Sequence, residues 1–277
     1  MTINCLGNLI NLSKPKILGI LNLTPDSFYD GGSYKNEAEI ITKVEKMLID
    51  GADFIDIGGY SSRPGAINIS VNEEIRRVAK VITLLKKQFP SILISIDTFR
   101  SNVAESFLDN GAAIINDISA GNLDIKMLET VAKYKVPYIM MHMKGTPQTM
   151  NTLTEYKNIT QEIIFYFSEK IAQARSLGIS DIIIDPGFGF SKKNEQNFEL
   201  LNNLDLLRTL ETPILTGISR KSMIYKTLNS SASEALNGTS ALHMIALQKG
   251  SKILRAHDVK EAKECILLYQ ALSKSDN

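Results

Sequence analysis

Eight short apolar runs alternate with helix-like stretches along almost the whole chain, and this alternation constrains the fold more than any other feature. The runs are rich in β-branched residues, and most are apolar on both faces. This is typical of buried parallel strands rather than of antiparallel strands with one solvated face. The eight runs are Ile17–Leu23, Phe54–Gly58, Ile92–Asp97, Ile114–Ile118, Tyr138–Met143, Asp181–Asp185, Ile214–Ser219 and Lys252–His257.

The stretches between these runs place apolar residues three and four positions apart, which predicts amphipathic helices. Examples are Ala38–Ile49, Glu73–Gln88, Ile159–Leu177, Glu234–Gln248 and Val259–Ala271. Asn72 followed by Glu73 and Glu74 indicates a helix start, where acidic side chains favour the positive end of the helix. Glycines follow several of these stretches and fit helix stops. They are Gly51, Gly111, Gly178 and Gly250.

Eight strand–helix units predict a (β/α)8 TIM barrel, taken as a single domain over residues 1–277. A doubly wound open sheet also alternates in this way and stays as the alternative, although eight evenly spaced units favour the barrel. Ahead of the first barrel strand, Thr2–Leu12 reads as two short strands around Gly7-Asn8. We therefore expect an N-terminal hairpin over residues 1–15 that covers the bottom of a barrel over residues 16–273.

The composition limits the classes of function. With 277 residues, 44% of them hydrophobic, the chain can bury a full core. The 31 basic and 30 acidic residues give a net charge of +1, which argues against nucleic acid as a partner. Cys5 and Cys265 fit neither a disulfide framework nor a metal site. The start Met1–Asn11 lacks a signal pattern, and no apolar run reaches a membrane-spanning length. We expect a cytoplasmic protein with no membrane contact.

Polar and ionisable side chains follow every apolar run, and in a barrel these carboxyl ends of the strands meet at one mouth. A single aspartate at a strand end is usually a turn or helix cap. Polar groups at all eight ends together indicate a binding site. They include Asn22, Ser62, Arg63, Asp97, Asn116, His142, Asp185, Lys221, Arg255 and His257.

These groups are of two chemical kinds. Asp97, Asn116 and Asp185 suit a flat heterocycle with several N–H donors, such as a 2-amino-4-oxo ring, since a carboxylate accepts parallel N–H bonds well. The second kind forms a cationic rim suited to phosphate. Its members are Arg63, Lys221, Arg255 and His257. Asn22 and Asp26 are placed to help hold Mg²⁺ together with phosphate oxygens.

Plainer interpretations exist for several of these residues. Arg63 beside a Pro-Gly turn fits a solvated loop, and Lys221 fits a surface helix start. His257 also fits a strand cap, although its spacing from Arg255 places both on one strand face. His142 fits packing inside the barrel, and His243 falls within a predicted helix. No His, Cys and carboxylate set has a zinc spacing, and no serine lies in a nucleophile elbow.

Seven motifs in this order resemble the dihydropteroate synthase family over nearly the whole chain. The motifs are Gly19–Phe28 (GILNLTPDSF), Asp56–Gly65 (DIGGYSSRPG), Ser95–Thr98 with Asn116-Asp117, Met141–Gly145 (MHMKG), Asp185–Ser191 (DPGFGFS), Gly217–Ser222 (GISRKS) and Ile253–Val259 (ILRAHDV). Seven motifs in order are far more specific than any one alone.

The resemblance implies a homodimeric (β/α)8 barrel that acts in folate synthesis. Such an enzyme condenses 6-hydroxymethyl-7,8-dihydropterin diphosphate with 4-aminobenzoate, releases pyrophosphate, uses Mg²⁺ and is inhibited by sulfonamides. Apolar side chains on the last two helices become candidates for dimer contacts, with packing onto the barrel as the alternative. They are Met244, Leu247, Ile266 and Leu267.

The resemblance also implies a role for each matching position. The pterin residues are Asp97, Asn116, Asp185 and Lys221. The residues for diphosphate are Asn22, Arg63, Arg255 and His257, with Asn22 as the metal ligand. The residues for aminobenzoate are Phe28, Ser62, Pro64, Phe190 and Ser222. Catalytic roles fall to Asp97, Lys221, Arg255 and His257.

Two positions depart from the family pattern. Tyr60 stands where the family usually has Glu, which removes a carboxylate at the base of the second loop. Ser62 stands where the family usually has Thr; it keeps the hydroxyl and loses one methyl, a change on the order of 1 kcal/mol in aminobenzoate or sulfonamide packing. Chemistry is expected to survive both changes.

The implied mechanism loses pyrophosphate before the amine attacks, leaving a pterin cation that Asp97 and Asp185 stabilise. Direct displacement uses the same residues. Two other functions compete with this one. A pterin-binding methyl transferase to a corrinoid shares the acceptor set but does not need the cationic rim. A non-catalytic pterin-binding protein is expected to lose the phosphate ligands, which this chain retains.

Overall fold

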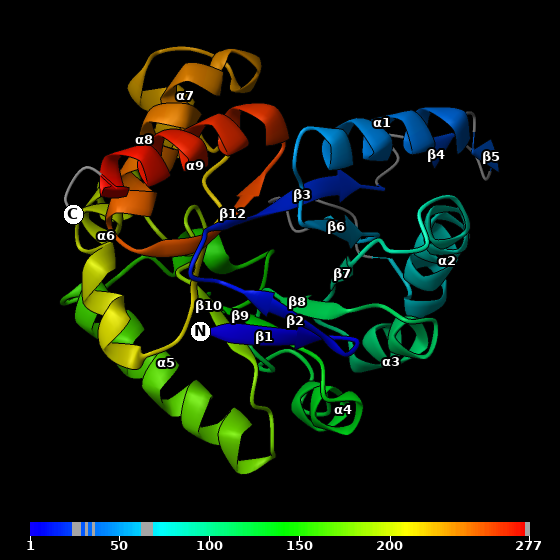
Figure 1. The fold of residues 1–277 in the computed structure, drawn as a ribbon. Coiled ribbons are helices and arrows are strands. Elements are labelled where there is room, and N and C mark those ends of the chain that lie inside the picture. Colours follow the sequence, from blue (N-terminus) through cyan, green and yellow to red (C-terminus); the bar gives the residue numbers. More distant parts are fainter. Residues whose placement is uncertain (24–28, 31–32, 35–36, 62–68, 275–277) are drawn as a thin grey trace.

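The computed structural model describes residues 1–23, 29–30, 33–34, 37–61 and 69–274. Within these residues, parallel strands close into a barrel whose neighbours follow the order of the chain, and helices surround it (Figure 1). The barrel strands are β3 (Lys16–Asn22), β6 (Phe54–Gly58), β7 (Ile94–Asp97), β8 (Ile114–Asp117), β9 (Tyr138–Met141), β10 (Ile182–Asp185), β11 (Ile214–Thr216) and β12 (Ser251–Ala256). The closed sheet confirms the predicted barrel and rules out the open-sheet alternative.

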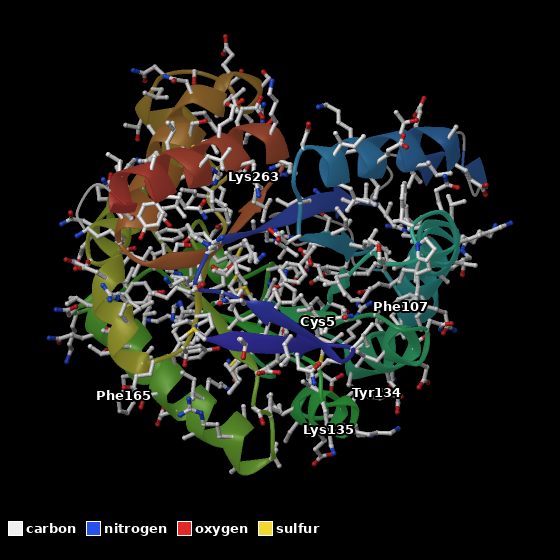
Figure 2. All side chains as sticks on the ribbon, in the orientation of Figure 1. Cys5, Phe107, Tyr134, Lys135, Phe165 and Lys263 are labelled. Atoms are coloured by element: carbon white, nitrogen blue, oxygen red, sulfur yellow. The ribbon has the colours of Figure 1, made fainter. Side chains whose placement is uncertain are left out.

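The outer ring is made of helices that follow the strands. They are α1 (Glu37–Ile49), α2 (Val71–Gln88), α3 (Ser101–Asp109), α4 (Met127–Tyr134), α5 (Ile159–Ser176), α6 (Asn194–Asn202), α7 (Ser222–Thr227), α8 (Leu236–Gln248) and α9 (Val259–Lys274). Short 3₁₀ turns lie at Met150–Thr152, Leu204–Leu210 and Ala232–Glu234. Figure 2 shows Phe165 on α5 away from the barrel, and it is 65% exposed. None of the described helices combines the length and apolarity that crossing a membrane requires.

Buried strand faces explain why the apolar runs form this barrel. All five residues of β6 are buried, and β3 is buried at its five central positions. One face of each strand packs inside the barrel and the other packs against the helices, so apolar residues occupy both. Several predicted runs extend past the strand that forms. β9 ends at Met141 and β11 at Thr216, which leaves His142 and Ser219 in the loops at the mouth.

The predicted hairpin forms, with its turn one residue earlier than expected. β1 (Thr2–Cys5) pairs antiparallel with β2 (Asn8–Asn11), so Leu6 and Gly7 make the two-residue turn. Both have positive φ, 54° and 86°, as the hairpin turn that matches strand twist requires. Asn8 therefore opens the second strand. A second short pair, β4 (Tyr29–Asp30) and β5 (Ser33–Tyr34), lies between β3 and α1.

The hairpin seals the bottom of the barrel. Ile3, Cys5 and Leu12 are at most 2% exposed, and Figure 2 labels Cys5 at the hairpin. They pack with residues from the barrel strands and the segments leading into them, which form one apolar cluster. Those residues are Leu18, Phe54, Ala113, Ile114, Ile139, Ile183, Leu215 and Ile253. This confirms the expected cover.

Two predictions about the outer ring are corrected. α2 begins at Val71, and its N-cap is Ser70, whose Oγ accepts a hydrogen bond from the Glu73 backbone N–H; Asn72 is inside the helix. Of the apolar residues expected to be exposed on the last two helices, Leu247 and Ile266 are fully buried because they pack into the core. The large apolar side chains exposed there, among the described residues, are Ile245, Leu267, Leu268 and Leu272.

Candidate active site

The carboxyl ends of the eight barrel strands ring a single mouth, opposite the hairpin. The register places Asp97 beside Asn116 and Asn22 beside Gly58 on neighbouring strands. The polar residues that follow the apolar runs are therefore brought to one end of the barrel, as the strand pattern predicted. Four predicted site residues, Phe28, Ser62, Arg63 and Pro64, and also Asp26, lie outside the described residues.

The centre of the mouth is a network of charges that Asp56 organises. Asp56 is 1% exposed and accepts hydrogen bonds from Ser95 Oγ at 2.6 Å and Asn116 Nδ2 at 3.0 Å. It also accepts from Arg255 Nε at 2.6 Å, while Arg255 Nη2 donates to Asp97 Oδ2 at 2.6 Å. One guanidinium thus joins two carboxylates, and the network brings together three of the predicted residues.

Sequence reasoning missed Asp56, although a signal was present. The residue lies in the middle of the run Phe54–Gly58, and that run was interpreted as apolar on both faces. A carboxylate in such a strand is buried whichever way it points, and buried charges are paired. The last predicted strand contains two side chains with a permanent positive charge, Lys252 and Arg255. Closure of the barrel brings Arg255 to Asp56.

Burial perturbs the ionisation of Asp97. Removal from water raises the pKa of Asp97 to about 7; the charge of Arg255 opposes this rise, and the nearby Asp56 carboxylate adds to it. The side chain keeps 20% of its surface exposed, so it faces the open mouth while Asp56 does not. Perturbed carboxylates in a concave site are typical of functional positions.

Asp185 is the last residue of β10 and lies at the same mouth. It is 5% exposed, and its Oδ1 accepts a hydrogen bond from the Gly187 backbone N–H at 2.8 Å. Burial raises the pKa of Asp185, and the Lys221 ammonium opposes the rise. A Cβ on Gly217 would lie 3.6 Å from Asp185 Oδ2 and 3.9 Å from Arg255 Cδ, so both side chains pass close over this glycine.

Lys221 faces the mouth rather than solvent. It is the extended residue before α7, and its Nζ donates to the backbone O of Phe188 and lies 4.8 Å from the centre of the Phe190 ring. Burial lowers the pKa of Lys221 to about 8, while Asp185 opposes the lowering. Lys221 is therefore not the surface helix-start residue of the alternative interpretation. Ser222, the first residue of α7, is half-buried beside it.

His257 lies one residue past the end of β12. The strand geometry that was expected to place His257 and Arg255 on one face therefore does not extend to His257. Its Nδ1 is 3.0 Å from Ser219 Oγ, and its backbone N–H donates to the same oxygen at 3.2 Å. The side chain is on the exposed rim, where partial removal from water and the charge of Arg255 lower the pKa of the imidazole.

The remaining predicted residues vary in surroundings. Asn22 ends β3 and is half-buried at the mouth. Phe190 packs at the edge of an apolar cluster that includes Met141 and Met143. His142 is 3% exposed, with its ring 4.9 Å from that of Tyr166 in an edge arrangement, which agrees with packing rather than ligand binding.

Tyr60, the position that departs from the family pattern, is held on three sides. Its ring lies 5.1 Å from the Phe99 ring in an edge contact and 5.1 Å from the Arg100 guanidinium. Its hydroxyl accepts a hydrogen bond from Gln148 Nε2 at 2.9 Å. Arg100 in turn pairs with the buried Glu74 at 2.8 Å. The carboxylate that pairs with Arg100 therefore comes from Glu74 on α2, and position 60 contributes an aromatic ring instead.

A closed barrel with an amide and several carboxylates buried at its mouth, beside a lysine and an arginine, defines an enzyme that binds a nitrogen-rich heterocycle. The family model described as pterin binding enzyme matches residues 18–257. Dihydropteroate synthase of Escherichia coli K12 is 40% identical over 274 residues, 98% of this chain and 96% of that protein. The chain belongs to the dihydropteroate synthase family.

Solved structures agree with this assignment. Yersinia pestis dihydropteroate synthase in a sulfonamide drug complex superposes with a TM-score of 0.92 at 38% identity, covering 99% of this chain and 100% of that one. Xanthomonas albilineans dihydropteroate synthase with 4-aminobenzoic acid gives 0.90 at 36% identity, with 98% of each chain covered. The fold and its whole length are shared with these proteins.

Proposed function

We propose that this protein condenses 6-hydroxymethyl-7,8-dihydropterin diphosphate with 4-aminobenzoate to form 7,8-dihydropteroate and pyrophosphate. Membership in the dihydropteroate synthase family supports the reaction, a transfer that forms a C–N bond. The observation that carries it is the Arg255 bridge between Asp56 and Asp97, with Asn116 bonded to the same Asp56. The relatives are dihydropteroate synthases, so they favour neither a methyl transferase to a corrinoid nor a protein that only binds pterin.

In this proposal the pterin ring lies across the centre of the mouth. Its amino and ring N–H groups are donors, and the acceptors nearest the open mouth are Asp97 and Asp185, with the Asn116 amide between them on the ring of strands. Lys221 donates to the ring oxygen or nitrogen from the opposite side. The four residues are buried or half-buried, which strengthens each hydrogen bond by excluding water.

The diphosphate lies toward the rim, with Asn22, Arg63, Arg255 and His257 as its proposed contacts. Mg²⁺ is the proposed metal. No group of three or more His, Cys, Asp or Glu side chains in the described residues is arranged to hold an ion. A lone amide oxygen from Asn22 therefore fits Mg²⁺ only in its usual substrate-bound form, with phosphate and water oxygens as the other ligands. When bound, the ion would neutralise charge on the leaving group.

Aminobenzoate enters last and packs on the outer part of the mouth. Phe28, Ser62, Pro64, Phe190 and Ser222 are the proposed contacts, and sulfonamides are proposed to compete there. The half-buried Phe190 ring already lies against an apolar cluster and beside Lys221 Nζ. An aromatic amine stacks on such a ring with its carboxylate directed toward solvent.

The chemistry follows from the charges around the pterin. Loss of pyrophosphate leaves positive charge on the pterin methylene, and Asp97 and Asp185 stabilise it electrostatically. The aniline nitrogen then attacks the methylene carbon. Its proton becomes acidic once the C–N bond forms, so no side chain is needed as a strong base. Exclusion of water protects the cation from hydrolysis.

We also propose that the protein is a cytoplasmic homodimer. The exposed leucines of α9 support the dimer, because Leu267, Leu268 and Leu272 are each more than half exposed on one helix. Apolar side chains gathered in this way are typical of a surface that a partner covers.

Release of pyrophosphate tests the proposed reaction. The purified protein is mixed with the pterin diphosphate and Mg²⁺, with and without 4-aminobenzoate. The expected result is release that depends on aminobenzoate and is matched by formation of dihydropteroate. Pterin binding without any release in the presence of both substrates would contradict the proposal and favour a binding-only protein.

A further inference from the structure

A buried lysine that the proposed reaction does not use belongs to the β10–α6 loop, and its side chain turns back onto the rear of that loop. Lys192 is 8% exposed, and its Nζ donates to the backbone O of Gly187 and of Phe190, both at 2.9 Å. The same nitrogen lies 3.1 Å from His142 Nδ1. An amine is costly to bury, and burial lowers the pKa of Lys192 well below its ordinary value. An apolar side chain would fill the space without that cost.

The loop held by Lys192 has a shape that needs support. Gly187 and Gly189 have φ of +70° and +79°, and Ser191 has φ of +51°, which is unusual for a residue with a side chain. A Cβ on Gly187 would lie 2.2 Å from the backbone O of His142, so the loop packs directly on the end of β9. Two carbonyls of this tight loop turn inward to the amine of Lys192.

The next carbonyl of the same loop turns the other way, toward Lys221. Phe188 O accepts from Lys221 Nζ, and the Phe190 ring lies 4.8 Å from that nitrogen. The loop is thus bound from behind by Lys192 through Gly187 and Phe190, and it binds Lys221 in front through Phe188 and Phe190. The residues whose carbonyls bond Lys192, Gly187 and Phe190, therefore adjoin or carry both groups that contact the Lys221 amine.

We propose that Lys192 is a positioning residue that acts through Lys221: it holds the β10–α6 loop in the shape that directs the Lys221 amine at the pterin ring. The inference rests on the proposed function, because pterin is the ligand that Lys221 is proposed to contact. His142 Nδ1 lies 3.1 Å from Lys192 Nζ, and burial lowers the pKa of His142 well below its ordinary value, which disfavours a second positive charge beside the amine. Lys192 itself does not reach the substrate.

Binding of pteroic acid, a pterin joined to aminobenzoate, tests the inference by calorimetry. Lys192→Met is expected to weaken binding at least tenfold. Lys193→Met is the matched control, because Lys193 is the next residue, is 54% exposed and pairs only at the surface with Glu155 at 2.8 Å. It is expected to bind within twofold of the wild type. Lys192→Gln keeps an amide NH2 as donor, on a side chain one atom shorter, and is expected to fall between the wild type and Lys192→Met.

A double-mutant cycle separates positioning from general loosening of the fold. If Lys192 acts through Lys221, pteroic acid binds the double variant Lys192→Met/Lys221→Met no more weakly than Lys221→Met alone. The same coupling is expected with Lys192→Gln, which keeps the test decisive if the Met variant does not fold. Weakening that multiplies in the double variant would overturn the inference, as would wild-type binding by Lys192→Met. If the wild type itself does not bind pteroic acid, the proposed function fails with it.

Discussion

The two ends of this barrel are built on opposite principles. At the bottom, Ile3, Cys5 and Leu12 of the hairpin close an apolar cluster in which every member is nearly or fully buried. At the mouth, the buried Asp56 and the half-buried Asp97 share the half-buried guanidinium of Arg255. Burial of apolar surface stabilises a fold directly, whereas buried charges need partners to offset their lost hydration. The bottom therefore contributes stability, whereas the mouth holds the charged side chains that the proposed reaction uses.

Removing the central cation gives the largest expected effect. Arg255→Met leaves Asp56 and Asp97 facing each other without the charge that joins them. Breaking a buried pair in this way destabilises a protein by about 3–5 kcal/mol, and loss of a group that stabilises transition-state charge lowers turnover by roughly 10²–10³-fold or more. Urea unfolding and pyrophosphate release measure the two effects.

The control for this variant is an exposed ion pair. Lys133→Met removes the contact of Lys133 with Glu105, whose side chains are 65% and 44% exposed. Such pairs contribute about 0–1 kcal/mol, and this pair shares no residue with the Asp56–Arg255–Asp97 network. Equal effects of the two variants on turnover would contradict the account.

A cavity at the bottom is expected to separate stability from activity. Leu12→Ala removes a fully buried side chain and should destabilise the protein by about 2–5 kcal/mol, while kcat of the folded protein stays unchanged. Leu9, on the same hairpin, is 72% exposed, so Leu9→Ala is expected to change the unfolding free energy by less than about 0.5 kcal/mol. A large fall in kcat with Leu12→Ala would mean that the two ends are coupled.

The pH dependence of stability tests the charges at the mouth through Asp97. Because the pKa of Asp97 is raised from 3.8 to about 7, the folded state holds this proton more tightly than the unfolded state. The wild type should therefore lose stability relative to Asp97→Asn as pH rises from about 4 to 7, by roughly 2–4 kcal/mol, and no further above pH 7. Urea unfolding of both proteins across this range measures the difference. A difference that grows in the opposite direction would show that Arg255 outweighs burial at this site.

The smallest effect is expected at Tyr60. Tyr60→Phe removes the hydroxyl that accepts from Gln148 and keeps the ring contacts with Phe99 and Arg100. One such hydrogen bond contributes about 1 kcal/mol, so KM for aminobenzoate should rise by no more than roughly fivefold. Gln148→Leu, which removes the same bond from the other side, should match it. A much larger rise for only one of the two would show that the bond itself is not responsible.

The sequence predicts the fold well because burial on both faces leaves a clear apolar pattern. Each of the eight runs becomes a barrel strand, and the hairpin forms where Gly7 indicates it. The hairpin turn and the start of α2 were each misplaced, because local caps such as Ser70 compete with equally suitable neighbours. Leu247 and Ile266 were expected on the surface, but their exposure depends on how two helices pack together rather than on spacing along one.

The candidate site was predicted only where residues follow strand ends. Asp97, Asn116, Asp185 and Lys221 all lie at the mouth for that reason. Asp56 escaped notice because it lies inside a strand, and Lys192 because nothing in a loop sequence distinguishes a buried lysine from a solvated one. Which partner Arg255 takes depends on side-chain packing across the barrel, between residues 199 positions apart. Roles toward the ligands stay predictions.

The turnover of Asp97→Asn tests the central claim most directly, because the substitution keeps the size of the side chain and removes only its charge. Stabilisation of the pterin cation by Asp97 predicts that kcat for pyrophosphate release falls at least about 100-fold. The unfolding free energy at pH 8 is expected to stay at or above that of the wild type, since the carboxylate at position 97 no longer loses hydration on folding, while Asp56 stays paired with Arg255. Near-native turnover in this variant would contradict the claim that the charge of Asp97 stabilises the pterin cation.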